Sequence, residues 1–407
     1  MRMLSSLLAV AAIASSQIPA ADQARAQISG DVVRIGVLND QSGLYADITG
    51  QGSVLAARMA IEDFGGKVLD KPIEVIFADH QNKPDIGAAL ARQWFDRDGV
   101  DMITDVPNSA VALAVQGVAK EANRVHINSG AASTDLTGKQ CSPVGIHWAF
   151  DTYAMASGTG KTLVQQGGKT WFFITADYAF GHALERDTTK FIVDGGGQVL
   201  GSVRHPLSTA DFASFLLQAQ ASKAQVIGLA NAGGDTINSI KQGAEFGITA
   251  GGQKIAALLT HFPDVHALSL KVAQGLVVTE SYHWDLNDET RAWFKKFVAR
   301  NNGRPPSLIH AGTYGGVLHY LKAVKAAGTD EAKAVVAKMK ELPIDDFYTK
   351  GARIREDGRV MRPFYLMEVK KPEESKYPFD YYKLLATIPA EAAARPLADG
   401  NCEFVKK

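Results

Sequence analysis

Two short polar loops hold the side chains best suited to bind a small molecule. The first contains Asn108 and Ser109, and the second runs through residues 128–134 with the sequence NSGAAST. Each loop follows a short apolar run typical of a buried strand, and an apolar-periodic segment joins the two. This βαβ pattern puts both loops at the carboxyl ends of parallel strands, where open α/β sheets bind ligands. Small and hydroxyl-bearing residues leave backbone N–H groups accessible, so the loops predict a cradle for a small carboxylate.

Ser109 is expected to begin the helix that follows the first loop and runs through Val118. The first N–H groups of a helix lack partners, and the helix dipole adds roughly 0.3–1 kcal/mol of attraction for an anion. Ser109 could therefore cap the helix and donate to a ligand at once. The alternative is that it acts only as an N-cap.

Signatures of other chemistry fail on inspection. Residues 157–162 (SGTGKT) end like a phosphate loop, but the first glycine of that motif would fall at Met155. His261 and His266 have no cysteine or carboxylate at metal-ligand spacing. The hydrolase motifs G-x-S-x-G and H-E-x-x-H do not occur in the sequence. We therefore expect no catalytic residue, no metal and no cofactor, and interpret the chain as a binding protein rather than an enzyme.

The charge balance and the first residues indicate an exported protein that does not bind nucleic acid. The chain has 43 Lys plus Arg and 43 Asp plus Glu, so it lacks the positive surplus that nucleic acid binding needs. Residues 1–26 combine an early Arg, an apolar run over 7–13 and the end Ala24-Arg25-Ala26, typical of a signal peptide cleaved near Ala26. A membrane anchor is excluded because the run is shorter than the roughly 20 residues that a span requires.

The two cysteines, Cys141 and Cys402, are expected to form a disulfide, because an exported chain matures in an oxidising compartment. The bond would tie the C-terminal tail to the loop after Thr137. Two free thiols are the alternative.

Strand and helix patterns alternate in two successive series of similar size. Strands are expected at residues 32–38, 73–78, 170–175, 225–230, 254–260 and 275–279, and helices at 51–64, 152–167, 181–193 and 308–327. The alternation predicts an α/β fold with two lobes, each built on a parallel, doubly wound sheet. Lobe 1 is expected to comprise residues 27–150 and 281–343, and lobe 2 residues 151–280 and 344–390, followed by a tail over 391–407. Paired strands around the turn at Asp357-Gly358 are expected near the end of the chain.

Four segments carry a resemblance to a known family. They are VRIGVLNDQSGLYADITGQG, DVPNSAVALAVQGVAKEANRVHINSGAASTDLT, ITADYAFGHAL and AQGLVVTESY. In this order and spacing, and behind a signal peptide, the chain resembles type I periplasmic solute-binding proteins of the branched-chain (hydrophobic) amino acid ABC transporter family, with its aromatic-acid-binding branch as a candidate. The resemblance covers nearly the whole mature chain. It implies two Rossmann-like lobes joined by a three-strand hinge, a periplasmic location, closure on a ligand in the cleft, and delivery of that ligand to a membrane permease.

The resemblance also implies roles for individual residues. Asn108 and Ser109 in the first loop, and Ala131, Ala132 and Ser133 in the second, match the family's carboxylate holders. Phe180 stands where the family often has a tyrosine that covers the ligand. Asn231 and Ala232 occupy a loop of the second lobe where an aromatic residue is common.

One departure from the family bears on the ligand. Members that bind α-amino acids place an acidic side chain after the strand equivalent to residues 254–260, where it pairs with the ligand's ammonium. Here the segment 258–263 reads LLTHFP, and the nearest acid, Asp264, follows Pro263. An unpaired buried ammonium would cost several kcal/mol. The departure favours a carboxylate with an apolar or aromatic body.

Six aromatic residues near the predicted cleft could stack on such a body or belong to the core. They are Tyr45, Tyr178, Phe180, Phe262, Tyr282 and Trp284. The full set of expected ligand-binding residues is Tyr45, Asn108, Ser109, Ser129, Ala131, Ala132, Ser133, Tyr178, Phe180, Asn231, Thr260, His261 and Tyr282. The predicted function is capture of a small carboxylate for an ABC importer by a monomeric protein. The alternatives are a binding protein for branched-chain or other hydrophobic amino acids and a ligand-sensing receptor module, which would need a membrane span or a signalling domain.

Overall fold

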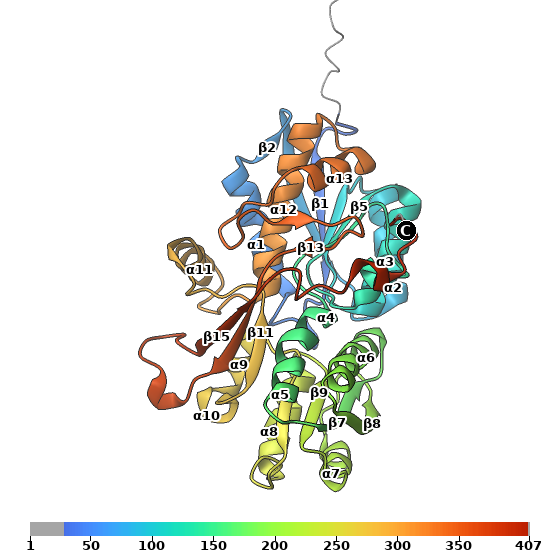
Figure 1. The fold of residues 1–407 in the computed structure, drawn as a ribbon. Coiled ribbons are helices and arrows are strands. Elements are labelled where there is room, and N and C mark those ends of the chain that lie inside the picture. Colours follow the sequence, from blue (N-terminus) through green and yellow to red (C-terminus); the bar gives the residue numbers. More distant parts are fainter. Residues whose placement is uncertain (1–27, 406–407) are drawn as a thin grey trace, which may run out of the picture.

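The computed structural model describes residues 28–405, which form two lobes placed one above the other in Figure 1. Each lobe contains a largely parallel sheet flanked by helices, as the sequence predicts. The signal peptide expected at residues 1–26 lies outside the described residues. Among residues 28–405, no helix combines the length and the apolar character needed to cross a membrane.

The first lobe is built on a six-stranded sheet with the order β2-β3-β1-β4-β5-β6, in which only β2 is antiparallel to its neighbour. The strands are β1 (Val33–Asn39), β2 (Lys67–Val68), β3 (Lys71–Asp79), β4 (Met102–Asp105), β5 (Val125–Asn128) and β6 (Gly145–His147). The helices of this lobe are α1 (Gly50–Phe64), α2 (Pro84–Asp96), α3 (Ser109–Ala122), α12 (Leu308–Ala327) and α13 (Ala332–Glu341), with α11 (Asp288–Arg300) beside α1.

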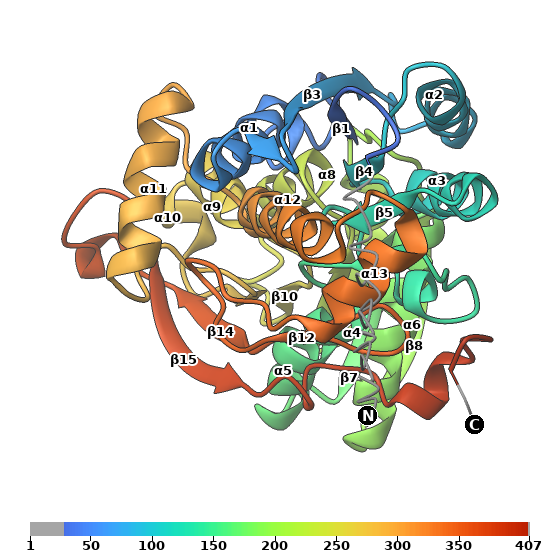
Figure 2. The ribbon, with the colours of Figure 1, turned by 90° about the horizontal axis from the view of Figure 1, so that it is seen from above.

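Both faces of this sheet are covered, because successive side chains of a strand point to opposite sides. Val37 belongs to the larger apolar core together with residues of α1 and α12. Its neighbour Leu38 belongs to a second core made with α2 and α3. Figure 2 shows α1 and α12 on one side of the sheet and α2 and α3 on the other.

The second lobe is built on a four-stranded parallel sheet with the order β10-β9-β7-β8. The strands are β7 (Thr170–Ala176), β8 (Gln198–His205), β9 (Val226–Ala230) and β10 (Lys254–Ala257). The helices are α4 (Thr152–Met155), α5 (Lys161–Gln165), α6 (Ala179–Asp194), α7 (Ala213–Ala221), α8 (Gly234–Glu245), α9 (Phe262–Leu268) and α10 (Leu270–Ala273). A π-helical segment, Ala156–Gly160, joins α4 to α5 where the sequence predicts one uninterrupted helix.

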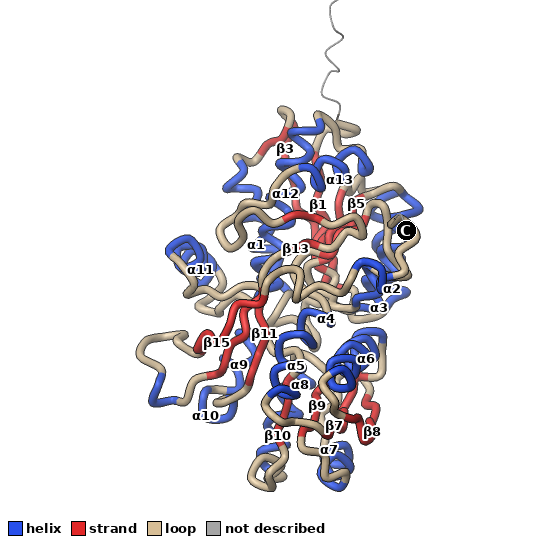
Figure 3. Tube along the Cα trace, viewed as in Figure 1, coloured by secondary structure: helices blue, strands red, loops and turns tan. Residues whose placement is uncertain are grey.

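A third, antiparallel sheet lies beside the second lobe (Figure 3) and has the order β11-β14-β15. Its strands are β11 (Val277–Glu280), β14 (Phe364–Val369) and β15 (Tyr382–Ile388). The strand expected at 275–279 therefore belongs to this sheet and not to the parallel sheet of the second lobe. Periodicity could not show this, because the partner strand lies about ninety residues later in the chain.

A short antiparallel pair, β12 (Arg353–Ile354) with β13 (Val360–Met361), encloses the expected turn at Asp357-Gly358. It lies against the first lobe: β12 contacts α13, and Arg359 is bridged to His147 at the end of β6. These contacts place residues 344–361 beside the first lobe, whereas the sequence led us to expect them in the second. The lobe boundaries at residues 150 and 280 stay a proposal.

The chain crosses between the lobes three times, after β6, after β11 and after β13, which is the expected three-strand hinge. The tail after β15 then returns to the first lobe, where Cys402 is bonded to Cys141 with 5.6 Å between the Cα atoms. The predicted disulfide is thus confirmed.

Candidate functional site

A small cavity lies between the two lobes, at the carboxyl ends of the parallel strands. Eleven residues line it: Tyr45, Ile48, Pro107, Gly130, Ala132 and Ile309 from the first lobe, and Tyr178, Phe180, Ala232, Leu259 and His261 from the second. Its volume is about 10 Å³, close to the room that one water molecule needs. The lobes are therefore closed on each other in this structure, and a larger ligand requires them to part.

Five helices of at least three turns begin at or within two residues of the cavity lining. The lining residues concerned are Ile48 before α1, Pro107 before α3, Tyr178 before α6, Ala232 before α8 and Ile309 in the first turn of α12. The first N–H groups of a helix have no partner within the helix, and the positive end of the helix dipole lies there. Within the described part of the chain, no lining residue carries a carboxylate. The cavity is therefore suited to an anion and unsuited to an ammonium group.

Asn108 is the N-cap of α3, a role that the sequence led us to consider for Ser109. The Asn108 side-chain oxygen accepts from the N–H groups of Ala110, at 3.0 Å, and Val111, at 3.2 Å. Ser109 Oγ instead accepts from the Ser133 N–H at 3.2 Å, which ties the two predicted loops together. The hydroxyl proton of Ser109 remains free to donate, and no hydrogen bond from the Ala132 N–H to another described residue is found. These donors lie where the sequence predicts a carboxylate cradle.

The close approach of the two loops depends on a glycine. A Cβ atom on Gly130 would lie 2.6 Å from Asp105 Oδ1 and 2.8 Å from Pro107 Cα, so a larger residue would push the loops apart. Asp105 and Val106 both have positive φ angles, +79° and +51°, which is uncommon for residues with a side chain. The backbone strain turns the chain from β4 into the loop that brings Pro107 to the cavity.

Two tyrosines close the cavity from opposite lobes. Tyr45 Oη and Tyr178 Oη are 2.5 Å apart, and Tyr178 also contacts Phe180 with ring centroids 5.8 Å apart. Burial, with a smaller contribution from the Tyr178 phenol, raises the pKa of Tyr45 well above its usual value, so both phenols stay protonated at neutral pH. The pair is thus a neutral hydrogen bond between the lobes.

His261 lines the cavity from the second lobe and is the N-cap residue of α9. Its N–H donates to Asp264 Oδ2 at 2.8 Å, so the nearest acid after β10 is directed at the backbone rather than at the cavity. Burial, with a smaller contribution from His310, lowers the pKa of His261 to about 3, so its ring is neutral at pH 7. Thr260, next to it, is buried, and its hydroxyl has no partner among the described residues.

The structure brings only part of the predicted set to the cavity. Five predicted residues line it: Tyr45, Ala132, Tyr178, Phe180 and His261. Six others are buried within two residues of a lining residue in the chain without lining the cavity: Asn108, Ser109, Ser129, Ala131, Ser133 and Thr260.

Two predicted residues have other surroundings. The Asn231 side chain is held within the second lobe, where its Nδ2 donates to Ser239 Oγ at 3.0 Å. The Tyr282 ring packs edge-on against Trp293 and Tyr348 near the hinge. Of the remaining aromatic candidates, Phe262 stacks on Tyr381 and Trp284 on Phe294, so both are packing residues.

Sequence reasoning missed five lining residues, all without a functional group in the side chain: Ile48, Pro107, Gly130, Leu259 and Ile309. Pro107 and Gly130 lie inside the loops already singled out, so their positions could have been found. Ile309 is contributed by α12, far along the chain, and only the fold brings it to the site.

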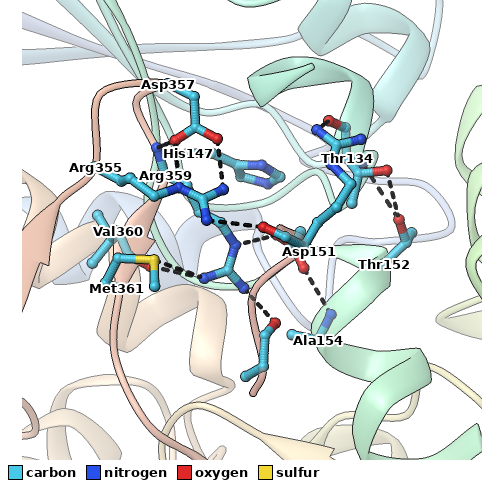
Figure 4. A network of polar contacts seen from close by, with 12 residues as sticks. Thr134, His147, Asp151, Thr152, Ala154, Arg355, Asp357, Arg359, Val360 and Met361 are labelled. Atoms are coloured by element: carbon cyan, nitrogen blue, oxygen red, sulfur yellow. Dashed lines mark hydrogen bonds and ion pairs between the residues drawn. The ribbon is translucent and has the colours of Figure 1, made fainter. Parts of the chain in front are cut away.

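A buried ion pair lies at the hinge next to this site. Arg359 Nε donates to Asp151 Oδ2, and Arg359 Nη2 donates to the Ala393 carbonyl at 2.9 Å, as Figure 4 shows for the pair. Asp151 Oδ1 also caps α4 by accepting from the Ala154 N–H at 2.7 Å. Burial alone would raise the pKa of Asp151, but the Arg359 guanidinium holds it below its ordinary value. Asp151 lies at the first crossing, Arg359 lies just before β13 and the third crossing, and Ala393 belongs to the tail. These contacts therefore hold the three segments together.

Two lobes, a three-strand hinge and a donor-rich interlobe cavity define a solute-binding protein that closes around its ligand. The family of periplasmic binding proteins matches residues 32–376, and the chain belongs to this family. It is a solute-binding protein that acts in transport, and it is not an enzyme.

Solved structures agree with this assignment. A periplasmic binding protein from Burkholderia mallei is 54% identical, with a TM-score of 0.91 over 92% of this chain and 100% of that one. A branched-chain amino acid ABC transporter periplasmic ligand-binding protein from Burkholderia xenovorans LB400 is 40% identical, with a TM-score of 0.81 over 91% and 99% of the two chains. An ABC transporter solute-binding protein from R. palustris in complex with benzoate shares the fold, at 22% identity and a TM-score of 0.78 over 88% and 97%.

Proposed function

We propose that this protein captures a small carboxylate with an apolar or aromatic body between its lobes and presents it to an ABC permease. The observation that carries the proposal is the cavity itself, where five helix N-termini converge and no lining side chain from the described residues bears a negative charge. A carboxylate there would accept hydrogen bonds from the Ala132 N–H and the Ser109 hydroxyl. The remaining walls, including Ile48, Leu259 and Ile309, are apolar and suit a ring or a branched chain.

Closure follows from contacts that one ligand makes with both lobes. The donors lie on the first lobe, while Phe180 and Leu259 belong to the second. A ligand that touches both sets stabilises the closed state over the open one. Roughly micromolar affinity, about −8 kcal/mol, is attainable from a few charge-assisted hydrogen bonds and a buried apolar body.

Isothermal titration of the mature protein against benzoate, phenylacetate, leucine and valine tests the ligand class. We expect heat of binding from at least one aromatic acid and none, or much weaker binding, from the amino acids. Binding of leucine and valine alone would refute the aromatic preference. Delivery is tested separately: cells that lack the gene should take up the labelled ligand more slowly than cells that carry it.

A branched-chain amino acid is the second candidate, and one observation favours it. Asp235, in the first turn of α8, is buried close enough to Tyr45 to affect its titration, and its Oδ1 has no partner among the described residues. That oxygen could receive an ammonium group from the side of the second lobe. Burial raises the pKa of Asp235 to about 7, which weakens this role at neutral pH. If leucine binds, Asp235→Asn should abolish its binding.

A further inference from the structure

His261 is the one residue of the cavity lining whose side-chain polar atoms are left without a partner. Only three lining residues of the described chain have polar side chains, and the other two, Tyr45 and Tyr178, are hydrogen-bonded to each other. Neither ring nitrogen of His261 reaches a hydrogen-bond partner among residues 28–405, although the residue is 1% exposed. A buried polar group without a partner destabilises the folded protein, because it has lost its hydrogen bonds to water. The position therefore calls for a partner from outside the chain.

The imidazole is fixed in place by its surroundings. Its backbone is held at the start of α9 by the bond from its N–H to Asp264, and the Phe150 ring meets it edge-on with centroids 5.5 Å apart. The nearby imidazole of His310 is already fully used, because it accepts from the Ser307 N–H at 3.0 Å and its other nitrogen contacts the Thr49 carbonyl at 2.8 Å. His261 therefore faces the cavity as a preorganised group, and no neighbouring histidine can take its hydrogen bond.

The charge state restricts what this group can bind. A neutral imidazole offers one donor and one acceptor and carries no charge to balance an ionised group. A hydroxyl suits it in either tautomer, because a hydroxyl can both donate and accept. An ammonium group suits it poorly, since the cavity lining has no carboxylate and five helix N-termini face it.

We propose that His261 is a specificity-determining residue that hydrogen-bonds a neutral hydroxyl on the body of the ligand, so that the site selects hydroxylated aromatic acids over their unsubstituted parents. The proposal rests on the proposed function, because it assumes that the carboxylate of the ligand lies at the donors of the first lobe. The two polar ends of the ligand then meet different lobes, and the hydroxyl adds to closure. Discrimination arises because an acid without a hydroxyl leaves the His261 ring unpaired in the closed state.

The test is a matched pair of titrations on the full mature protein. Benzoate and the three hydroxybenzoate isomers are titrated into the native protein, and at least one isomer is expected to bind about tenfold more tightly than benzoate. In His261→Phe, which keeps an aromatic ring but removes both nitrogens, that isomer should weaken about tenfold while benzoate stays within about twofold. His261→Gln restores a donor and an acceptor and should recover most of the preference.

His266→Phe is the control, because His266 lies on α9, which begins directly after His261, but outside the cavity, where it contacts Tyr381. This variant should keep the preference, and circular dichroism should show native folding for all three variants. Equal weakening of benzoate and the hydroxybenzoate in His261→Phe would overturn the inference, as would a native protein that does not distinguish them. Failure of the proposed function looks different: the native protein would bind leucine and none of the aromatic acids.

Discussion

At the scale of single residues, the hydrogen bond between Tyr45 and Tyr178 connects the lobes directly across the cavity. Tyr178→Phe keeps the ring and removes this bond, so the closed state loses about 0.5–1.5 kcal/mol and ligand affinity should fall by about twofold to tenfold. Titration of the best ligand measures the change. Tyr153→Phe makes the same chemical change outside the cavity lining and should leave affinity unaltered. Equal affinities of Tyr178→Phe and the native protein would show that the bond does not contribute to closure.

Asp105 predicts a pH dependence of stability. Burial raises its pKa from 3.8 to about 7, although its Oδ2 accepts from Asn39 Nδ2 at 2.8 Å. The folded protein therefore binds more protons than the unfolded chain between about pH 4 and pH 7, so the free energy of unfolding falls as pH rises through this window. Asp105→Asn cannot titrate and should lose less stability over the same window. Urea unfolding at pH 5 and pH 8 measures the difference, and equal losses in both proteins would contradict the prediction.

The sequence predicts ligand-binding residues from the chemical type of their side chains, and this explains which of them line the cavity. Tyr45, Tyr178 and His261 have recognisable side chains on loops at strand ends, and all three line the cavity. Asn231 is polar and lies at a strand end too, but its hydrogen bonds with Ser239 and Thr236 keep it inside the second lobe. Whether a polar side chain points at a ligand or at its own lobe depends on partners that only the folded chain brings near.

At the scale of elements, the start of α3 sets the position of the first predicted loop. Asn108→Ala removes the oxygen that accepts from two N–H groups of α3 and should lower the free energy of unfolding by about 0.5–2 kcal/mol. Asn108→Asp keeps an acceptor at the cap and should remain near native stability. Urea unfolding of both variants measures this, and titration should show weaker ligand binding for Asn108→Ala alone. Equal stability of the two variants would mean that the cap does not hold the loop.

Elements with a strong local pattern were predicted almost to the residue, and those that depend on distant partners were not. The helix expected at 308–327 is observed as Leu308–Ala327, because its apolar positions and its flanking Ser307 and Gly328 are local signals. The π-helical segment Ala156–Gly160 has no such signal. A Cβ atom on Gly158 would lie 2.2 Å from Thr279 Oγ1, so this interruption is coupled to a strand more than a hundred residues later.

At the scale of the whole molecule, the tail forms a fourth connection between the lobes. After β15 it passes Arg359, donates from Arg395 Nη2 to the Thr134 carbonyl at 3.1 Å, and ends at the disulfide with Cys141. Replacing Cys141 and Cys402 together by Ala should lower stability by about 2–4 kcal/mol and speed cleavage by a glutamate-specific protease after Glu391. Dithiothreitol should lower the melting temperature of the native protein and leave that of the double variant unchanged. An identical cleavage rate in both proteins would show that the tail stays bound without the disulfide.

The buried pair of Asp151 and Arg359 joins the first crossing to the strand that leads into the third. The ion pair therefore stabilises the hinge and not one lobe alone. Both side chains are almost fully buried, and removing either one leaves the other charge without its partner in a low-dielectric interior. Arg359→Met and Asp151→Asn should therefore each cost about 3–5 kcal/mol, while the double variant should cost clearly less than the sum.

A double-mutant cycle measured by urea unfolding gives this coupling. The exposed pair Arg34 and Glu74, with 2.8 Å between Nη2 and Oε2, is the control and should show almost no coupling because solvent screens it. Additive losses at Asp151 and Arg359 would mean that each residue acts through its other contacts, the α4 cap for Asp151 and the Ala393 carbonyl for Arg359. Strong coupling would instead mean that the two crossings are held in one arrangement, so that the lobes rotate about a hinge whose base stays rigid.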